Sequence, residues 1–335
     1  MTNLQRRFSE GRRVAALSLV LAIAGLLACG RSPATAADVP AGLLLGAKRV
    51  AILGDSVTHG GAWVADLTAW MERRGTGAEV INVGLPSETV SGLSEEGHAG
   101  GQFPRPDLAE RLDRVLRVVR PDLVIACYGM NCGIYQPLDD IRFAKFKAGM
   151  EQLHATVEQS GAKILHLTPP LYDKRPDQAG PAGGDTDYDA VLGAYSTWLL
   201  SKQADGWIVI DVHGPMSAML ASARAKDPAA VFAPDTVHPN DDGHWAMARA
   251  VITGLGDSTA AEAATPAAFA AILPEVTARL HLLRDAYLAA AGHLRPGLPA
   301  GLPIEEAEEK ARAITESIRS RRPPRQSEQD APVSP

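Results

Sequence analysis

The chain has 335 residues, enough for one large domain with an extension or for two modest domains. Hydrophobic residues make up 46% of it and charged residues 21%, the composition of a globular protein with a full core. The formal net charge of -6 argues against non-specific nucleic-acid binding, which needs a basic face to displace counterions. With three cysteines the chain is not a disulfide scaffold.

The N-terminus has the pattern of an export signal. Four arginines precede an uncharged apolar stretch, residues 14–28. This stretch is shorter than the ~20 residues of a membrane span, which favours a signal peptide at residues 1–28 over an uncleaved anchor. Its end, Leu-Leu-Ala-Cys, resembles a lipobox and predicts a lipidated Cys29, whereas Ala-Thr-Ala at 34–36 predicts ordinary cleavage near residue 36. Each pattern predicts an exported protein, either a periplasmic or cell-envelope lipoprotein, attached to the membrane only through Cys29, or a secreted one.

After a predicted linker at residues 37–47, short apolar runs alternate with segments of helical periodicity. Five runs rich in Val, Ile and Leu predict buried parallel strands at residues 49–53, 79–83, 123–128, 163–168 and 207–211. Alternating strands and helices predict a parallel sheet covered on both faces. We therefore predict an α/β fold, a three-layer α/β/α sandwich with a five-stranded parallel sheet, over residues 48–254.

Residues 255–319 predict a C-terminal helical extension. Two helical segments, 274–294 and 304–319, flank a connector rich in Pro and Gly. In the second segment a narrow apolar seam follows four-and-three spacing and consists of Ala307, Ala311, Ile314 and Ile318. We expect this seam to dock on the main domain, with a dimer contact as the alternative. Residues 320–335 are rich in Pro, Ser and charge, which predicts a disordered tail.

Polar residues and glycines follow three of the predicted strands, at the sheet edge where open α/β sheets place their sites. The first strand leads into Gly54-Asp55-Ser56, where the Ser56 hydroxyl can act as a nucleophile; a turn or helix-capping serine is the alternative. The second strand ends in Asn82-Val83-Gly84, and the third leads into Gly129-Met130-Asn131. The N–H groups of Ser56 and Gly84 and the Asn131 amide could donate three hydrogen bonds to a developing oxyanion. Ordinary turn residues are the alternative for each block alone.

Asp235 and His238 follow the last predicted strand on one loop. A hydroxyl nucleophile needs a base within hydrogen-bond reach, and the base needs an acceptor that fixes its tautomer. An Asp and a His three residues apart can supply both. His238, Asp241, Asp242 and His244 could also be read as metal ligands, but Asp242-Gly243-His244 suits a turn and a helix start. We therefore expect no metal and no other cofactor.

The four blocks, in this order and each at a predicted strand end, resemble those of the SGNH hydrolases, also called GDSL esterases and lipases. The resemblance covers nearly the whole central domain and implies the flavodoxin-like fold of that family. It also implies that Ser56 is the nucleophile, His238 the general base and Asp235 the residue that orients the imidazole. The oxyanion hole would then consist of the Ser56 and Gly84 N–H groups and the Asn131 side chain.

Two positions depart from the family pattern. The third block usually reads Gly-x-Asn-Asp, but Cys132 stands where the last Asp would be, which leaves the support of the Asn131 loop open. The second block usually has another Gly three residues after its first, and here Ser87 stands there. Cys127 and Cys132 are interpreted as two buried thiols, with a disulfide as the alternative.

We expect hydrolysis of a carboxylic ester through an acyl-enzyme. The Gly-rich loop at residues 91–106 leaves the sheet beside the expected oxyanion hole and either covers it or is a plain surface loop. Its polarity favours a small acyl group, such as acetyl, on a carbohydrate or a similar polar alcohol. The alternatives are a lysophospholipase or other fatty-acyl esterase, a thioesterase, and, from other classes, an acyltransferase or a non-catalytic binding domain.

Overall fold

The computed structural model describes residues 42–175, 178, 186–258 and 270–321. All described residues belong to one unit of the chain, Ala36–Pro335. The signal segment, Cys29, the cleavage site and most of the predicted tail lie outside the described residues and stay predictions. Among the described helices, none is long and apolar enough to span a membrane.

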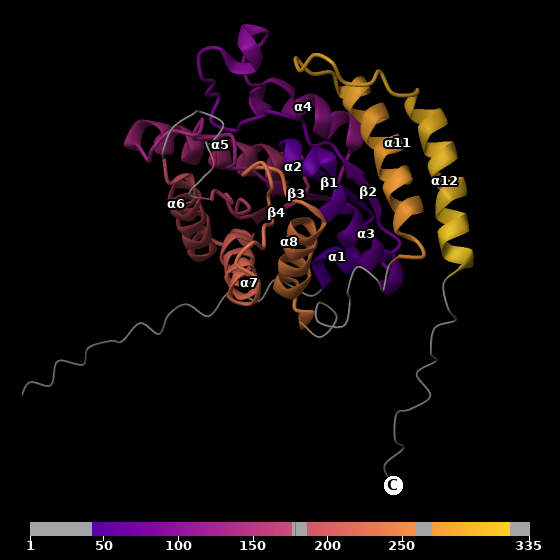
Figure 1. Ribbon diagram of the computed structural model, residues 1–335. Helices are drawn as coiled ribbons and strands as arrows, with labels where there is room; N and C mark the ends of the chain where they lie inside the picture. Colours follow the sequence, from indigo (N-terminus) through magenta and orange to yellow (C-terminus); the bar gives the residue numbers. More distant parts are fainter. Residues whose placement is uncertain (1–41, 176–177, 179–185, 259–269, 322–335) are drawn as a thin grey trace, which may run out of the picture. The chain divides into compact units, whose positions relative to one another are not determined.

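Five parallel strands form one sheet in the order β2-β1-β3-β4-β5 (Figure 1). The strands are β1 (Arg49–Gly54), β2 (Glu79–Asn82), β3 (Leu123–Cys127), β4 (Lys163–Leu167) and β5 (Ile208–Ile210). They confirm the predicted strands, with ends that move by at most one residue. β1 pairs with β2 on one side and with β3 on the other, so the order of the sheet reverses there. Such a switch point opens a crevice at the carboxyl ends of the strands.

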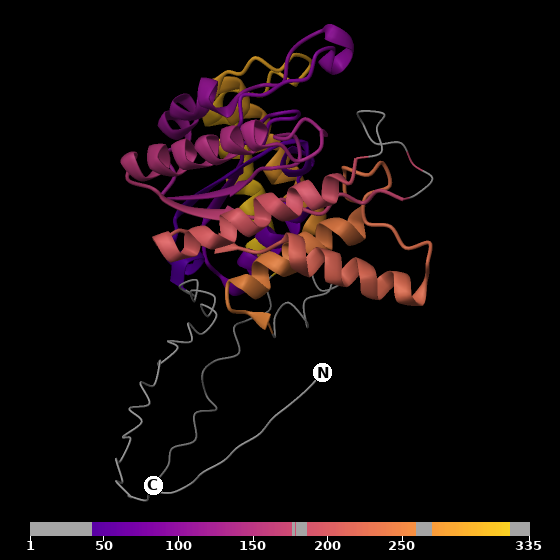
Figure 2. The same ribbon diagram turned by 90° about the vertical axis from the view of Figure 1, so that its left-hand side faces the viewer.

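Helices cover both faces of the sheet, which confirms the predicted three-layer fold (Figure 2). One face carries α3 (Ala62–Arg74), α7 (His213–Lys226) and α8 (Asp241–Gly254), and the other carries α4 (Leu108–Val119), α5 (Asp140–Gln159) and α6 (Tyr188–Ser201). Successive residues of a strand point to opposite faces, so Val50 and Ile52 pack into the first layer and Ala51 and Leu53 into the second. Burial of both faces explains the continuous apolar runs of the strands.

Short helices complete the described part of the domain. They are α1 (Gly42–Gly46), α2 (Ser56–Gly60) and the 3-10 turns η1 (His98–Gly101) and η2 (Lys202–Asp205). The predicted linker at residues 37–47 is helical over α1 because Leu43 and Leu44 are buried in the core.

The C-terminal extension forms α11 (Leu273–Ala291) and α12 (Ile304–Ser320). α11 packs against β2, α3 and α4, and α12 packs against α11 (Figure 1). The seam residues Ala307, Ala311 and Ile318 are buried, so the seam docks within the chain. β2 is an edge strand, and an uncovered edge can pair with other chains. α11 therefore covers an edge that could otherwise pair with a strand of another chain.

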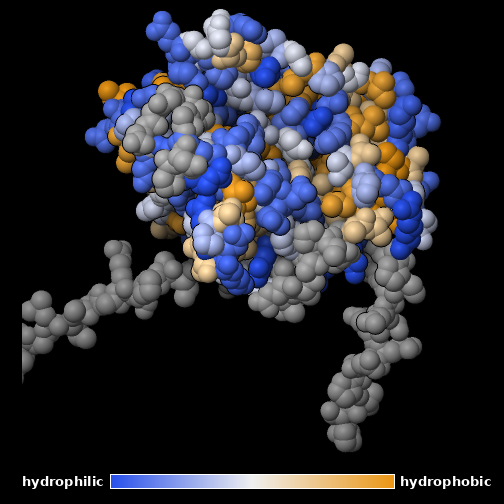
Figure 3. Space-filling view, viewed as in Figure 1, coloured by the Kyte–Doolittle hydropathy of each residue, from blue (hydrophilic) through white to orange (hydrophobic). Residues whose placement is uncertain are grey.

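The face of the molecule shown in Figure 3 is mostly hydrophilic, and its apolar side chains lie in small groups.

A glycine in α5 lets this helix approach the chain that follows β2. A methyl group on Gly149 would overlap the Val90 carbonyl oxygen. Val90 precedes the loop that reaches the carboxyl edge of the sheet, so this close contact fixes the start of that loop.

We expect Gly149→Ala to destabilise the protein, although alanine favours a helix by up to about 1 kcal/mol over glycine. The backbone overlap forces α5 or Val90 to move, at a cost of about 1–3 kcal/mol or more. The control is Gly193→Ala in α6, where the nearest atom to a new methyl is the His213 Nε2, 3.7 Å away. Urea unfolding should show a lower midpoint for the first variant and an equal or higher one for the second. Equal midpoints for both variants would contradict the close-contact interpretation.

Candidate active site

The turn after β1 places Ser56 at the first residue of α2. β1 ends at Gly54, where any side chain would overlap the side chain of Thr58, so the turn requires glycine. Asp55 caps α2, since its Oδ1 accepts a hydrogen bond from the Val57 N–H at 3.0 Å. Ser56 therefore lies at the carboxyl end of β1, beside the switch point of the sheet.

Asp235 and His238 reach Ser56 from the loop before α8. The His238 Nε2 lies 2.8 Å from the Ser56 Oγ, and the His238 Nδ1 lies 2.7 Å from the Asp235 Oδ2. The other carboxylate oxygen, Oδ1, accepts hydrogen bonds from the N–H groups of Val237 at 3.0 Å and His238 at 2.7 Å. The structure thus brings the three predicted residues into one continuous hydrogen-bonded line.

Asp173, to which no sequence pattern points, binds the backbone of this loop at residues 232, 233 and 236. Its buried carboxylate accepts hydrogen bonds from the N–H groups of Phe232 at 2.7 Å and Ala233 at 3.1 Å, and it pairs with Arg224. Its own N–H donates to the Thr236 carbonyl at 3.0 Å. Thr236 has a φ of 79°, an unusual value for a β-branched residue, so the loop is held in a strained conformation.

The Asp235 carboxylate is charged in its role as acceptor. Partial burial raises its pKa, but hydrogen bonds from the backbone and ring of His238 and from the Val237 N–H outweigh this, so the pKa is lower than usual. The side chains of Asp235 and His238 are 58% and 51% exposed. The His238 and Asp235 side chains are therefore accessible to water.

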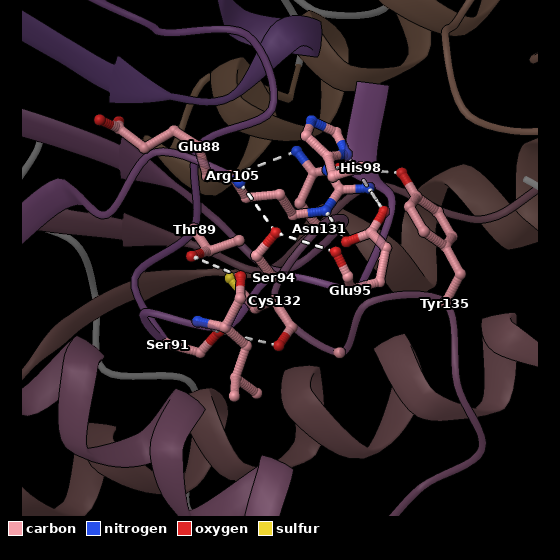
Figure 4. Close-up of polar contacts among 12 residues, drawn as sticks. Glu88, Thr89, Ser91, Ser94, Glu95, His98, Arg105, Asn131, Cys132 and Tyr135 are labelled. Atoms are coloured by element: carbon pink, nitrogen blue, oxygen red, sulfur yellow. Dashed lines mark hydrogen bonds and ion pairs between the residues drawn. The ribbon is translucent and has the colours of Figure 1, made fainter. Parts of the chain in front are cut away.

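Asn131 is buried, and the hydrogen bonds that orient its side-chain amide go to the amide oxygen (Figure 4). The Oδ1 accepts hydrogen bonds from the Arg105 Nη1 at 2.8 Å and from the Tyr135 hydroxyl at 2.9 Å. The Nδ2 has one long contact, 3.4 Å, to the Glu88 carbonyl. A primary amide has two N–H donors, so one remains for another acceptor.

Gly84 differs from its predicted role as an oxyanion donor. Its N–H donates to the Asn82 side-chain oxygen at 2.9 Å, and the Asn82 amide donates to the Thr58 carbonyl at 2.7 Å. The Gly84 carbonyl lies 3.0 Å from the His59 Nδ1. The second block thus braces α2, the helix that carries Ser56, and its Gly84 N–H is already paired.

The backbone N–H of Ser87, three residues after Gly84, is another potential donor beside Asn131. Residues 85–88 form a turn closed by the hydrogen bond from the Glu88 N–H to the Leu85 carbonyl at 3.2 Å, with Ser87 at a φ of 69°. This is the position where a type II turn prefers glycine. The turn starts where the Leu85 N–H donates to Gly54 and ends at Glu88, whose carbonyl contacts Asn131. Within the described residues, the Ser87 N–H has no hydrogen-bond acceptor.

A buried ion pair lies behind this turn. The Arg111 Nε and Nη2 donate to the two carboxylate oxygens of Glu88 at 2.5 and 2.7 Å, and the Tyr128 hydroxyl donates to Glu88 at 2.6 Å. Arg111 also donates to the Val83 carbonyl at 2.8 Å. All three side chains are buried, so this group links the β2 loop, α4 and the end of β3.

The Gly-rich loop predicted at residues 91–106 contacts the Asn131 segment and the C-terminal extension. At its start, the Ser91 hydroxyl donates to the Cys132 carbonyl at 2.9 Å. Near its end, the Arg295 guanidinium lies over the Phe103 ring at 4.5 Å, so the loop meets the α11–α12 connector (Figure 2). Both ends of the loop are thus held by contacts, while residues 96–97 and 99–102 between them are exposed.

α11 reaches the helix of the nucleophile. The Arg284 Nη1 donates to the His59 carbonyl, near the end of α2, at 2.8 Å. A cation at a helix C-terminus satisfies a free carbonyl and complements the helix dipole. The extension therefore contacts α2 directly.

Cys127 and Cys132 are free buried thiols, and burial raises the pKa of both, that of Cys132 to about 12. The disulfide alternative is thus absent from the structure, and both thiols are in their unreactive form. Among the described residues, no three His, Cys, Asp or Glu side chains are grouped closely enough to hold a metal.

Comparison with known proteins identifies one family. The model of the GDSL-like lipase/acylhydrolase family matches residues 52–246. No curated protein matches the sequence. Among solved structures, a gut microbial diltiazem-metabolizing enzyme is similar with a TM-score of 0.50 and 20% identity, over 62% of this chain and 47% of that one. The match thus spans about half of that enzyme and bears on the fold alone.

Two further structures have lower scores. An acetylxylan esterase from Geobacillus stearothermophilus has a TM-score of 0.46 at 19% identity, over 62% of this chain and 94% of its own. An acetyl xylan esterase, AlAXEase, has a TM-score of 0.46 at 19% identity, over 61% and 98% of the two chains.

Asp55 is a second carboxylate near His238, in the opposite environment to Asp235. It is buried, and burial raises its pKa to about 6, while the Val57 N–H and the nearby His238 and Arg105 act in the other direction. The native state therefore binds a proton more tightly than the unfolded chain does. Its contribution to stability is greatest at low pH and is lost as pH rises from about 4 to 6.

Asp55→Asn should remove this pH dependence and keep an acceptor for α2. Between pH 4 and 7 the unfolding free energy of the variant should fall by about 3 kcal/mol less than that of wild type, because burial raises the pKa of Asp55 to about 6 in the native state alone. The measurement is urea unfolding at several pH values.

Asp139 provides a matched control, because it caps α5 in the same way but is exposed at its carboxylate. The hydrogen bond from the Arg142 N–H lowers its pKa, so Asp139→Asn should change the pH dependence in the opposite sense. Parallel curves for wild type and Asp55→Asn would contradict the buried-carboxylate interpretation.

Proposed function

The chain belongs to the GDSL-like lipase/acylhydrolase family and is a serine ester hydrolase, in which we propose that Ser56, His238 and Asp235 form the catalytic triad. The observation that carries the proposal is the line of hydrogen bonds from the Ser56 Oγ through both ring nitrogens of His238 to Asp235, at 2.8 and 2.7 Å. The His238 ring accepts from Ser56 only if its proton is on Nδ1, which the Asp235 carboxylate favours.

In the proposed reaction the Ser56 oxygen attacks the ester carbonyl while its proton passes to the His238 Nε2. The resulting imidazolium is stabilised by the Asp235 carboxylate. Collapse of the tetrahedral intermediate breaks the bond to the alcohol, which leaves with the proton from Nε2. Water then gives a proton to the same nitrogen as it attacks the acyl-enzyme. Collapse of this second tetrahedral intermediate releases the acid, and the proton on Nε2 returns to the Ser56 oxygen.

The oxyanion of the intermediate needs donors that are already in place. We propose the Ser56 N–H and the Asn131 amide for this role. The Ser87 N–H is our candidate for the third donor in place of Gly84, since the Gly84 N–H is paired with Asn82 and the Ser87 N–H is unpaired.

We propose a small acyl group, such as acetyl, on a carbohydrate or a similar polar alcohol as the substrate. The exposed His238 and Asp235 side chains support a shallow, open site, and the neighbouring Glu95, Arg105 and Tyr135 are polar. A long acyl chain would need apolar walls that remove it from water. The openness also favours water as the acyl acceptor, because transfer to another alcohol requires water to be kept out.

The test is a panel of p-nitrophenyl esters from acetate to laurate, together with acetylated sugars. We expect kcat/KM to be highest for acetate and to fall by at least about tenfold along the panel, and acetate to be released from the sugars. A fluorophosphonate should label Ser56, and Ser56→Ala should abolish both labelling and turnover. Rates that rise with chain length would favour a fatty-acyl esterase, and turnover that requires an added alcohol would favour a transferase.

Asp235→Asn should fold normally and lose about 10³–10⁴ in kcat, in line with the loss in another serine triad. The Asn oxygen can still accept from the Val237 and His238 N–H groups, so its NH2 would face the ring at Nδ1. This forces the ring proton to Nε2, where the ring cannot accept from Ser56. Asp242→Asn, which removes an exposed carboxylate in the first turn of α8, should stay within about twofold of wild type. Equal activity of both variants would rule out the role proposed for Asp235.

A further inference from the structure

One side chain of the Gly-rich loop returns to the site. Arg105 lies two residues before Asp107, the residue that caps α4, yet its side chain is only 6% exposed and ends against Asn131. Figure 4 shows it between the loop and the Asn131 segment. Sequence reasoning gave Arg105 no role, because the contact joins residues that are 26 positions apart.

The guanidinium of Arg105 is held in a fixed orientation. Its Nε and Nη2 donate to the two carboxylate oxygens of Glu95, both at 2.6 Å, and its backbone N–H donates to the Ser94 hydroxyl at 2.9 Å. The His98 Nδ1 lies 3.2 Å from Glu95, and the guanidinium lies 5.4 Å from the centre of the Tyr135 ring. Two of its three nitrogens are thus occupied, and the third, Nη1, points at Asn131.

The contact decides which end of the Asn131 amide faces the site. An amide group can present either its oxygen or its NH2, and the partners of one end fix the other. Here the oxygen has two donors, Arg105 and Tyr135, so the NH2 must face away from them. A cation on the oxygen also polarises the amide and makes its N–H a stronger donor.

We propose that Arg105 is a positioning residue that orients and polarises Asn131 as an oxyanion donor, with Glu95 holding it in place. The inference rests on the function proposed above. It also answers the question that Cys132 leaves open: where the family usually has a supporting Asp, this chain has a buried thiol, and support for Asn131 comes from the neighbouring loop instead.

A double-mutant cycle tests the proposal, with Arg105→Met, Asn131→Ala and the double variant assayed on p-nitrophenyl acetate. Loss of one oxyanion donor costs about 10²–10³ in kcat, so weakening it should cost about 10–10². We expect Arg105→Met to lower kcat by that factor with KM within about threefold of wild type. In the Asn131→Ala background the same change should cost less than about twofold, because its target is gone.

Two more variants keep the test decisive if Arg105→Met does not fold. Arg105→Lys keeps one cationic donor and should restore part of the kcat, and Glu95→Gln, which loosens the guanidinium, should also lose its effect in the Asn131→Ala background. The matched control is Arg114→Met. Arg114 donates to the Ala291 carbonyl at 2.7 Å, far from Asn131 in the hydrogen-bond network, and its loss should leave kcat within about twofold.

The outcomes separate this inference from the proposed function. Additive losses in the cycle, or a change confined to KM, would show that Arg105 acts independently of Asn131 and would overturn the inference while Ser56 still reacts. Absence of ester hydrolysis by wild type, or full activity of Ser56→Ala, would instead overturn the proposed function.

Discussion

The buried ion pair between Glu88 and Arg111 is the constraint on which the site depends. Glu88 is the residue after Ser87, whose N–H is the candidate third donor. The Glu88 carboxylate accepts hydrogen bonds from Arg111 and Tyr128, and the Glu88 carbonyl contacts the Asn131 amide. Taking two charges out of water is costly, and the cost is recovered only when the geometry is close to ideal. The pair therefore contributes little to the net free energy of unfolding, and its main effect is to fix the position of the turn at residues 85–88. A small shift of this turn would leave one of the two buried charges unpaired. The ion pair thus fixes the positions of α4, the turn after β2 and the end of β3 relative to one another.

Two carboxylates near one imidazole illustrate how environment divides the roles. Asp235 is exposed and surrounded by N–H donors, which keep its pKa low and make it a permanent partner for the ring. Asp55 is buried, its pKa is raised to about 6, and its hydrogen bond is to the backbone of α2. The same functional group thus serves as an electrostatic partner in one place and as a helix cap in the other.

The sequence predicted those features that depend on local pattern. The strands follow from continuous apolar runs, and Ser56 lies at the strand end that its block predicts. Asp235 and His238 lie instead on the loop between α7 and α8, so their meeting with Ser56 follows from the family resemblance and not from a strand end. The Gly84 N–H was assigned as a free donor, but the structure pairs it with the side chain of Asn82 two residues earlier, a local turn that asparagine commonly forms with its own backbone. Arg105 and Asp173 were missed because their partners lie 26 and 59–60 residues away, and a loop arginine or aspartate carries no pattern that points to them. The positive φ of Ser87 did have a signal, since Ser87 follows Pro86 and stands where the family usually has glycine, although serine itself rarely adopts this φ.

The contact between Arg284 and the end of α2 has a consequence for how the molecule is assembled. The two residues are 225 positions apart, and β2 is covered by the same helix. A chain that ended at residue 254 would contain every residue of the proposed triad, yet the edge of its sheet would be bare and a carbonyl of the nucleophile's helix would lack its donor. Contacts of such separation form late, because the entropy of closing the intervening chain must be overcome first. The nucleophile near the start of the domain thus acquires its final surroundings only when the last helices have docked.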